Sequence, residues 1–135
     1  MSAGCAGAGT MLFDTDVLIW ALRGNVRASR AVDDADARAL SVVSYMELLQ
    51  GARDKPEVRA IREYLADLGF RILPLTENIG HRASIYMEEH ALSHSMSMAD
   101  ALITATAVEA SEAILTANAK HYRAVRELTV RRFRP

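Results

Sequence analysis

Met11-Leu-Phe-Asp-Thr-Asp-Val-Leu-Ile19 is the stretch of sequence that decides the fold. Its apolar start predicts a short buried strand over 11–14, and the residues that follow predict a helix over 16–22. Asp14 therefore stands at the end of a buried strand. Burying a charged side chain is costly unless hydrogen-bond partners or a cation lie beside it. Asp14 is thus the first candidate for a functional residue.

Short apolar runs alternate with amphipathic stretches along the rest of the chain. We expect further strands over 39–43, 71–75, 113–116 and 128–133. We expect helices over 26–36, 44–52, 56–68, 76–91 and 98–110, and a helical turn over 120–125. This alternation is typical of an α/β protein. It predicts three layers, in which a central, mainly parallel sheet of about five short strands carries helices on both faces.

The composition limits the class of protein. With 135 residues the chain is long enough for one domain with a real core, and we assign that domain to residues 11–135. Residues 1–10, rich in Ala, Gly and Ser, read as a flexible leader, either native or appended. The 16 basic and 17 acidic residues give a formal net charge of -1, and hence no overall attraction to nucleic acid or membrane. Five arginines between residues 123 and 134 form a local basic patch that suits RNA, an acidic partner or a solvated tail.

Cysteine usage and hydropathy indicate the compartment. The single cysteine, Cys5, cannot form an internal disulfide, which suits a reducing environment. No apolar stretch is long enough to span a bilayer, and the N-terminus lacks the features of a signal peptide. We therefore expect a cytoplasmic protein with no membrane partner.

Two further carboxylates resemble Asp14 in position. Glu47 and Asp100 each stand near the start of a predicted helix that follows an apolar strand. Because the carboxyl ends of parallel strands meet at one edge of a sheet, we expect the three acids to lie together there, joined by Asn118. Carboxylate oxygens are ligands that Mg²⁺ prefers, and a bound divalent cation can promote hydrolysis of a phosphodiester. The sequence thus predicts a hydrolytic metal site.

A structural interpretation of two of these acids is also open. Ser44-x-x-Glu47 matches the capping box, in which a Ser caps a helix and an acid three residues later binds back to the cap. Ser97-x-x-Asp100 matches the same pattern. Asp14 has no such structural explanation in the sequence. The two interpretations are compatible, since helix N-termini help crowded carboxylates to coexist.

Four motifs carry a resemblance to a known family. They are Phe13-Asp-Thr-Asp-Val-Leu-Ile19, Ser44-Tyr-Met-Glu-Leu-Leu-Gln-Gly51, Asp100-Ala-Leu-Ile-Thr-Ala-Thr-Ala107 and Leu115-Thr-Ala-Asn-Ala-Lys-His-Tyr122. With these motifs in this order, the chain resembles PIN-domain ribonucleases of the VapC type, the toxins of type II toxin–antitoxin systems. It departs from the family at Asp16, where Asn is more common. At the fourth acidic position it has either Asn118 or His121.

The resemblance implies an endoribonuclease, dependent on Mg²⁺ or Mn²⁺, that cleaves tRNA, rRNA or mRNA. It implies that Asp14 and Asp100 hold one metal, which Glu47 reaches directly or through water, and it adds Asn118 to the catalytic residues. It gives three neighbours the role of orienting the ligands: Thr15, Asp16 and Thr116. It also implies a homodimer and a VapB-like antitoxin that blocks the active sites.

Two alternatives remain open. A PIN-like scaffold without catalysis, or with weak catalysis, would keep the acids as helix caps and bind a partner or RNA, because Asn118 leaves the site one acid short. Asp14-x-Asp16 after a strand also resembles the start of the haloacid-dehalogenase-like phosphatases, in which the first Asp is a nucleophile. That class needs a Lys and a later acidic pair in addition.

Overall fold

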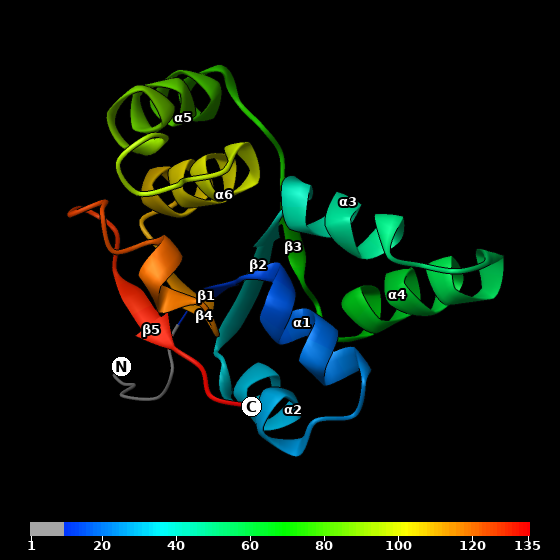
Figure 1. Cartoon of the computed structure of the whole chain (residues 1–135). Helices are drawn as coiled ribbons and strands as arrows, with labels where there is room; N and C mark the ends of the chain where they lie inside the picture. The colour runs from blue at the N-terminus through cyan, green and yellow to red at the C-terminus, as the bar shows by residue number, and fades with distance from the viewer. Residues whose placement is uncertain (1–9) are drawn as a thin grey trace.

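A five-stranded sheet, in which every strand runs parallel to its neighbours, forms the centre of the computed structural model (Figure 1). The structure describes residues 10–135. The strands lie in the order β3-β2-β1-β4-β5. They are β1 (Thr10–Phe13), β2 (Ala37–Ser41), β3 (Arg71–Leu73), β4 (Ala113–Thr116) and β5 (Val130–Arg132). The predicted α/β class and parallel sheet are confirmed. The predicted leader lies outside the described residues apart from Thr10, which begins β1.

Helices cover both faces of this sheet. They are α1 (Thr15–Leu22), α2 (Val26–Asp34), α3 (Val42–Gln50), α4 (Lys55–Asp67), α5 (Glu77–His90) and α6 (Met98–Glu109). Figure 1 shows α5 and α6 together on one side of the sheet and α1, α2 and α4 on the other. A short 3₁₀ helix, η2 (Ala119–His121), follows β4. Within the described residues, no helix is both long enough and apolar enough to cross a membrane.

Two hydrophobic cores hold the sheet between its helices. Side chains alternate along a strand, so Met11 and Phe13 pack in the core with α1, α2 and α4, whereas Leu12 packs in the core with α5 and α6. In β4, Leu115 and Ile114 divide between the two cores in the same way. Leu12 and Phe13 are fully buried, and burying such a side chain contributes roughly 2 kcal/mol. Both cores therefore fix the end of β1, where the polar residues of the site begin.

The start of α3 differs from the prediction. The sequence predicts a strand to residue 43 and a helix from residue 44, whereas β2 ends at Ser41 and α3 begins at Val42. Ser41 caps the helix, because its Oγ accepts a hydrogen bond from the Val43 N–H at 3.0 Å. The predicted capping box of Ser44 and Glu47 is therefore wrong, and Ser44 is buried inside the helix. The β-branched pair Val42-Val43 favours a strand locally, and the contacts of α3 with α1 and α6 override that preference.

The other elements lie where the sequence places them and differ at their ends. α2 stops at Asp34 and β3 stops at Leu73, each two residues earlier than predicted. The helical turn after β4 is confined to Ala119–His121, and β5 is shorter than the predicted strand. Such differences are expected, because the ends of helices and strands depend on contacts that a local pattern does not contain.

Candidate active site

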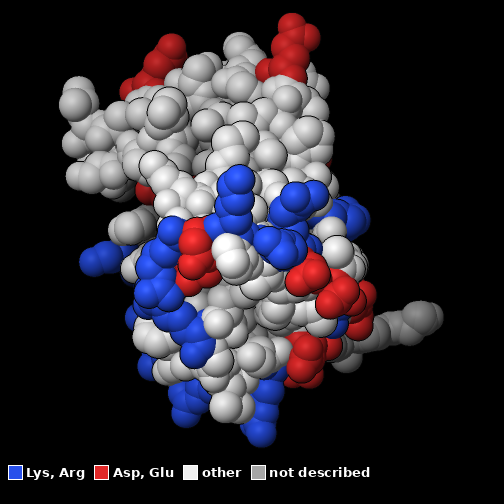
Figure 2. All heavy atoms as spheres, turned by 90° about the vertical axis from the view of Figure 1, so that its right-hand side faces the viewer, with Lys and Arg blue, Asp and Glu red and all other residues white. Residues whose placement is uncertain are grey.

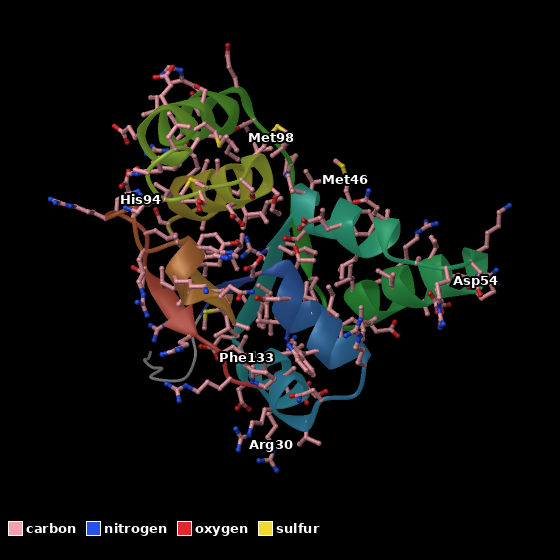
Figure 3. All side chains as sticks on the ribbon, in the orientation of Figure 1. Arg30, Met46, Asp54, His94, Met98 and Phe133 are labelled. Carbon is pink, nitrogen blue, oxygen red and sulfur yellow. The ribbon has the colours of Figure 1, made fainter. Side chains whose placement is uncertain are left out.

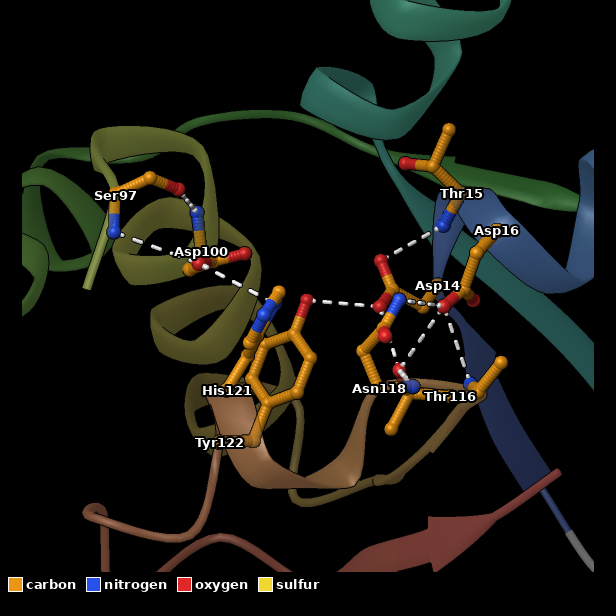
Figure 4. A network of polar contacts seen from close by, with 10 residues as sticks. Asp14, Thr15, Asp16, Ser97, Asp100, Thr116, Asn118, His121 and Tyr122 are labelled. Atoms are coloured by element: carbon orange, nitrogen blue, oxygen red, sulfur yellow. Dashed lines mark hydrogen bonds and ion pairs between the residues drawn. The ribbon is translucent and has the colours of Figure 1, made fainter. Parts of the chain in front are cut away.

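Asp14 follows β1 and begins α1 as its N-terminal cap. Its backbone N–H donates to Leu115 O at 2.9 Å, which ties the residue to β4. Its side chain accepts three hydrogen bonds (Figure 4). Oδ1 accepts from the Thr15 N–H at 2.8 Å, and Oδ2 accepts from the hydroxyls of Thr116 at 2.8 Å and Tyr122 at 2.9 Å. The expectation that Asp14 has no structural role is therefore wrong: it is a helix cap surrounded by neutral donors.

No basic side chain within residues 10–135 compensates the charge of Asp14. Burial, and after it the charge of Asp16, raises the pKa of Asp14 to about 6, against the opposing effect of its three hydrogen bonds. Burial also raises the pKa of Asp16. Among residues 10–135, no Lys or Arg forms an ion pair with either carboxylate. Two crowded acids without a counter-charge fit a site for a cation.

Asp16 contacts the loop after β4. Its Oδ2 accepts hydrogen bonds from the Ala117 N–H at 3.2 Å and from the Asn118 side-chain amide at 2.9 Å. Thr116 Oγ1 is 3.5 Å from this oxygen and 2.8 Å from Asp14 Oδ2. Because a hydroxyl has a single proton, the shorter contact is the hydrogen bond. Asp16 Oδ1 is buried and has no hydrogen-bond partner in the part of the chain that the structure describes.

Glu47 on α3 is connected to Asp14 through Thr15. Its Oε1 accepts a hydrogen bond from Thr15 Oγ1 at 2.6 Å. Because the Thr15 N–H binds Asp14, this one residue links the carboxylate after β1 to a carboxylate on α3. Glu47 lies beyond the first turn of α3 and does not open the helix as the sequence predicts.

Asp100 lies on the other side of Tyr122. It belongs to the predicted capping box at the start of α6, which is confirmed. Ser97 Oγ accepts from the Asp100 N–H at 3.0 Å, and Asp100 Oδ2 accepts from the Ser97 N–H at 3.4 Å. His121 Nδ1 is 3.9 Å from the same Asp100 oxygen. Figure 4 shows Tyr122 between Asp100 and Asp14, and burial followed by the charges of these two acids raises the pKa of Tyr122.

The acids are of the residue types that bind a divalent cation, although the described residues do not bring them into one cluster. Nowhere in the described residues do three acidic, His or Cys side chains stand close enough together to hold an ion. Asp14 and Glu47 are linked through Thr15, and Asp14 and Asp16 through Thr116 and Asn118, whereas Asp100 lies beyond Tyr122. Oxygen ligands suit Mg²⁺ and Mn²⁺. The unsatisfied Asp16 oxygen and the uncompensated charge of Asp14 suit any such cation.

Tyr122 is the residue of this site that the sequence did not predict. In the sequence it is only the aromatic residue of the last motif. Tyr122 is 1 % exposed, and the hydroxyl of a buried Tyr usually finds a hydrogen-bond partner. A Tyr at a core position was therefore the signal that could have pointed to a polar neighbour.

A groove lies apart from these acids, between α1, α3 and α4. Its volume is about 620 Å³. Apolar side chains line it, among them Ile19, Leu48 and Ile61, together with Arg23 and Arg53. Figure 2 shows this side of the molecule, with Lys and Arg side chains gathered across its middle and acidic side chains beside them.

Solved structures share the fold of this chain. A chain of a toxin–antitoxin complex from Klebsiella pneumoniae is 26% identical with a TM-score of 0.74, and the match covers 88% of this chain and 95% of that chain. VapBC2 from Rickettsia felis, bound to a DNA fragment from its promoter, matches at 14% identity and a TM-score of 0.75, over 91% and 98% of the two chains. VapBC-5 from Mycobacterium tuberculosis matches at 20% identity and a TM-score of 0.63, over 92% and 98%. The last two likenesses show the fold alone.

The family follows from the sequence as a whole. None of the curated proteins compared with this chain matches it significantly. The PIN domain profile matches residues 11–127, a range that contains all four motifs. The chain belongs to the PIN domain family, as its motifs predict.

Proposed function

We propose that this PIN domain is a VapC-type toxin, an endoribonuclease that uses Mg²⁺ or Mn²⁺ to hydrolyse phosphodiester bonds of RNA. The observation that carries the proposal is the environment of Asp14. This carboxylate is buried, has no basic partner among the described residues, and shares a polar network with α3 and with the end of β4. Buried charges in proteins are normally paired or bound to metals. The likeness to a chain of the Klebsiella toxin–antitoxin complex supports the toxin role.

Asp14, Glu47 and Asp100 are the residues that we propose as metal ligands. Asp14 Oδ1 accepts one hydrogen bond, and a carboxylate oxygen can accept more than one, so it retains a lone pair for a cation. A bound divalent cation supplies charge stabilisation for the phosphate and lowers the pKa of a coordinated water. The acids alone would repel the phosphate.

The neighbouring residues position these ligands. Thr15 binds Asp14 through its N–H and Glu47 through its hydroxyl. Thr116 and Tyr122 hold the other oxygen of Asp14. Hydrogen bonds from outer residues fix the orientation of a ligand before the cation arrives, and losing one typically lowers metal affinity about 10–100-fold.

A VapB-like antitoxin is the partner that we propose for the groove between α1, α3 and α4. The apolar lining suits the apolar face of a bound segment. Arg53 is held by Glu57 at 2.7 Å, whereas Arg23 has no ion-pair partner among residues 10–135 and is exposed. Arg23 can therefore meet an acidic residue of the partner.

Exposed methionines support a homodimer. Met46 on α3 is 53% exposed and Met98 at the start of α6 is 70% exposed. Figure 3 shows both pointing outward where these two helices meet. Exposed apolar side chains that gather at one place favour an interaction surface, and we propose that a second copy covers this one. Together with its RNA substrate and antitoxin, the protein would act in the cytoplasm.

A catalytically inactive scaffold remains the second candidate. Two observations favour it: each acid already has local hydrogen-bond donors, and Asp100 lies apart from Asp14 in the capping box of α6. Such a protein would bind RNA or a partner without cleaving it. Membership of the PIN domain family leaves no support for the haloacid-dehalogenase-like alternative.

RNA cleavage separates these candidates. We expect the purified protein to cleave a tRNA and rRNA mixture with Mg²⁺ or Mn²⁺ and to stop when EDTA is added. Asp14→Asn, Glu47→Gln and Asp100→Asn should each lower the rate by more than about 100-fold, beyond the usual effect of an outer residue. Asp67→Asn, which removes an exposed charge at the end of α4, should cleave like the wild type. A wild type that binds RNA without cleaving it would identify the scaffold.

A further inference from the structure

Asp16 and Asn118 form a carboxylate–amide pair at the carboxyl edge of the sheet. Asn118 Nδ2 donates to Asp16 Oδ2 at 2.9 Å, although the two residues are 102 positions apart in the chain. The Ala117 N–H donates to the same oxygen at 3.2 Å. Two donors on one oxygen hold the Asp16 carboxylate in a single orientation.

The second oxygen of this carboxylate, Asp16 Oδ1, is left unsatisfied. It is buried and accepts no hydrogen bond of ordinary geometry from residues 10–135, although the Val17 N–H is near enough to the carboxylate to lower its pKa. Asp16 is also the acid whose charge acts on Asp14, and neither has a basic partner in the described chain. An oxygen that is fixed in place, carries charge and accepts no hydrogen bond of ordinary geometry has the properties of a cation ligand.

The direction of the hydrogen bond limits what Asn118 can do. A carboxylate only accepts hydrogen bonds, so Asn118 must present its amide nitrogen to Asp16. Its remaining polar atom is a neutral carbonyl oxygen, which is a weaker partner for Mg²⁺ than a charged carboxylate. Exchanging the two residues would reverse donor and acceptor, but it would set the amide nitrogen at position 16 against the Ala117 N–H, which needs an acceptor there.

On the basis of the proposed function, we propose that Asp16 is itself a ligand of the cation through Oδ1, and that Asn118 is the residue that positions it. The site then contains a fourth carboxylate although position 118 lacks one. The resemblance gives Asp16 the role of orienting the ligands, whereas in this proposal Asp16 is itself a ligand. Asn118 takes no direct part in metal binding.

Mn²⁺ binding without RNA, measured by calorimetry, gives the first test. We expect Asp16→Asn to weaken binding by at least about tenfold. Asp67→Asn should bind like the wild type. A Cd²⁺ titration of Asp16→Cys gives an independent result if Asp16→Asn folds poorly.

Cadmium binding separates a ligand from a residue that only positions one. In a Cys5→Ser background, Asp16→Cys places a thiolate at the expected ligand position, and thiolates select soft metals. We expect Cd²⁺ to produce a saturable thiolate-to-metal charge-transfer band in the ultraviolet. Asp67→Cys in the same background should give no such band at equal protein and Cd²⁺ concentrations.

The outcomes separate this inference from the proposed function. If the wild type binds Mn²⁺, Asp14→Asn abolishes binding and Asp16→Asn binds normally, the role of Asp16 is overturned and the proposed function stands. An Asp16→Cys protein without the band also overturns it. A wild type that neither binds Mn²⁺ nor cleaves RNA overturns both proposals.

Discussion

Tyr122→Phe removes one oxygen, the hydroxyl that donates to Asp14 Oδ2 at 2.9 Å, and leaves the buried ring in place. Above the Asp14 pKa of about 6 the acceptor is a charged carboxylate, and a hydrogen bond to a charged group contributes about 1.5–3 kcal/mol. Below that pKa the acceptor is a neutral carboxyl group, for which about 0.5–1.5 kcal/mol is typical. We therefore expect the substitution to lower the free energy of unfolding by about 1 kcal/mol more at pH 8 than at pH 5.

Urea unfolding of the metal-free protein, followed by circular dichroism at both pH values, measures this difference. Tyr86→Phe is the matched control, because the Tyr86 hydroxyl donates to Glu127 Oε2 at 3.0 Å. The Glu127 side chain is 50% exposed, and its pKa is lowered by hydrogen bonds, first from its own backbone. The control should therefore lose about 1 kcal/mol or less, equally at both pH values. If Tyr122→Phe also shows equal losses, the hydroxyl does not bind an ionising buried carboxylate and the reasoning fails.

Three further results are expected. Burial raises the pKa of Asp14 above its value in the unfolded chain, so the folded protein binds the extra proton and becomes less stable as the pH rises from about 4 to about 6, by up to about 3 kcal/mol. Asp14→Asn should flatten that part of the thermal-unfolding profile of the metal-free protein, and an unchanged profile would contradict the assignment. At about 100 times its Kd, Mn²⁺ should stabilise the wild type at pH 8 by about 2.7 kcal/mol. Protons compete with the cation for Asp14, so the thermal shift should be smaller at pH 5. An equal shift at pH 5 would argue against binding of Mn²⁺ at Asp14. Ser97→Ala should cost about 1 kcal/mol in urea unfolding, since it removes the cap of α6, and a loss no larger than that of the exposed Ser84→Ala would refute the cap.

The fold could be predicted because its main determinants are local. The apolar run before Asp14 marks β1, and the pattern of Ser97 and Asp100 marks the start of α6. The start of α3 could not be predicted in this way. Val42 and Val43 favour a strand by themselves, and their helical conformation depends on contacts with elements distant in sequence.

The acids of the site could be proposed from their residue types, but their partners could not. Thr116 and Tyr122 contact Asp14 across 102 and 108 positions, and no periodicity in the sequence encodes such a contact. The cap formed by Asp14 could have been predicted, because Asp is a preferred residue at the start of a helix. The pairing of Asp16 with Asn118 could not, since the sequence places both at this edge of the sheet but does not say which side chains bind each other there.

The long sequence separation between Asp14 and its two hydroxyl partners has a consequence for how the molecule matures. Contacts so far apart in the chain form slowly, and these cannot exist until β4 has joined β1. An incompletely folded molecule therefore carries every acid but not the arrangement that orients them. Only molecules that have finished folding would then show the proposed nuclease activity, and any substitution that lowers the native population would lower that activity with it.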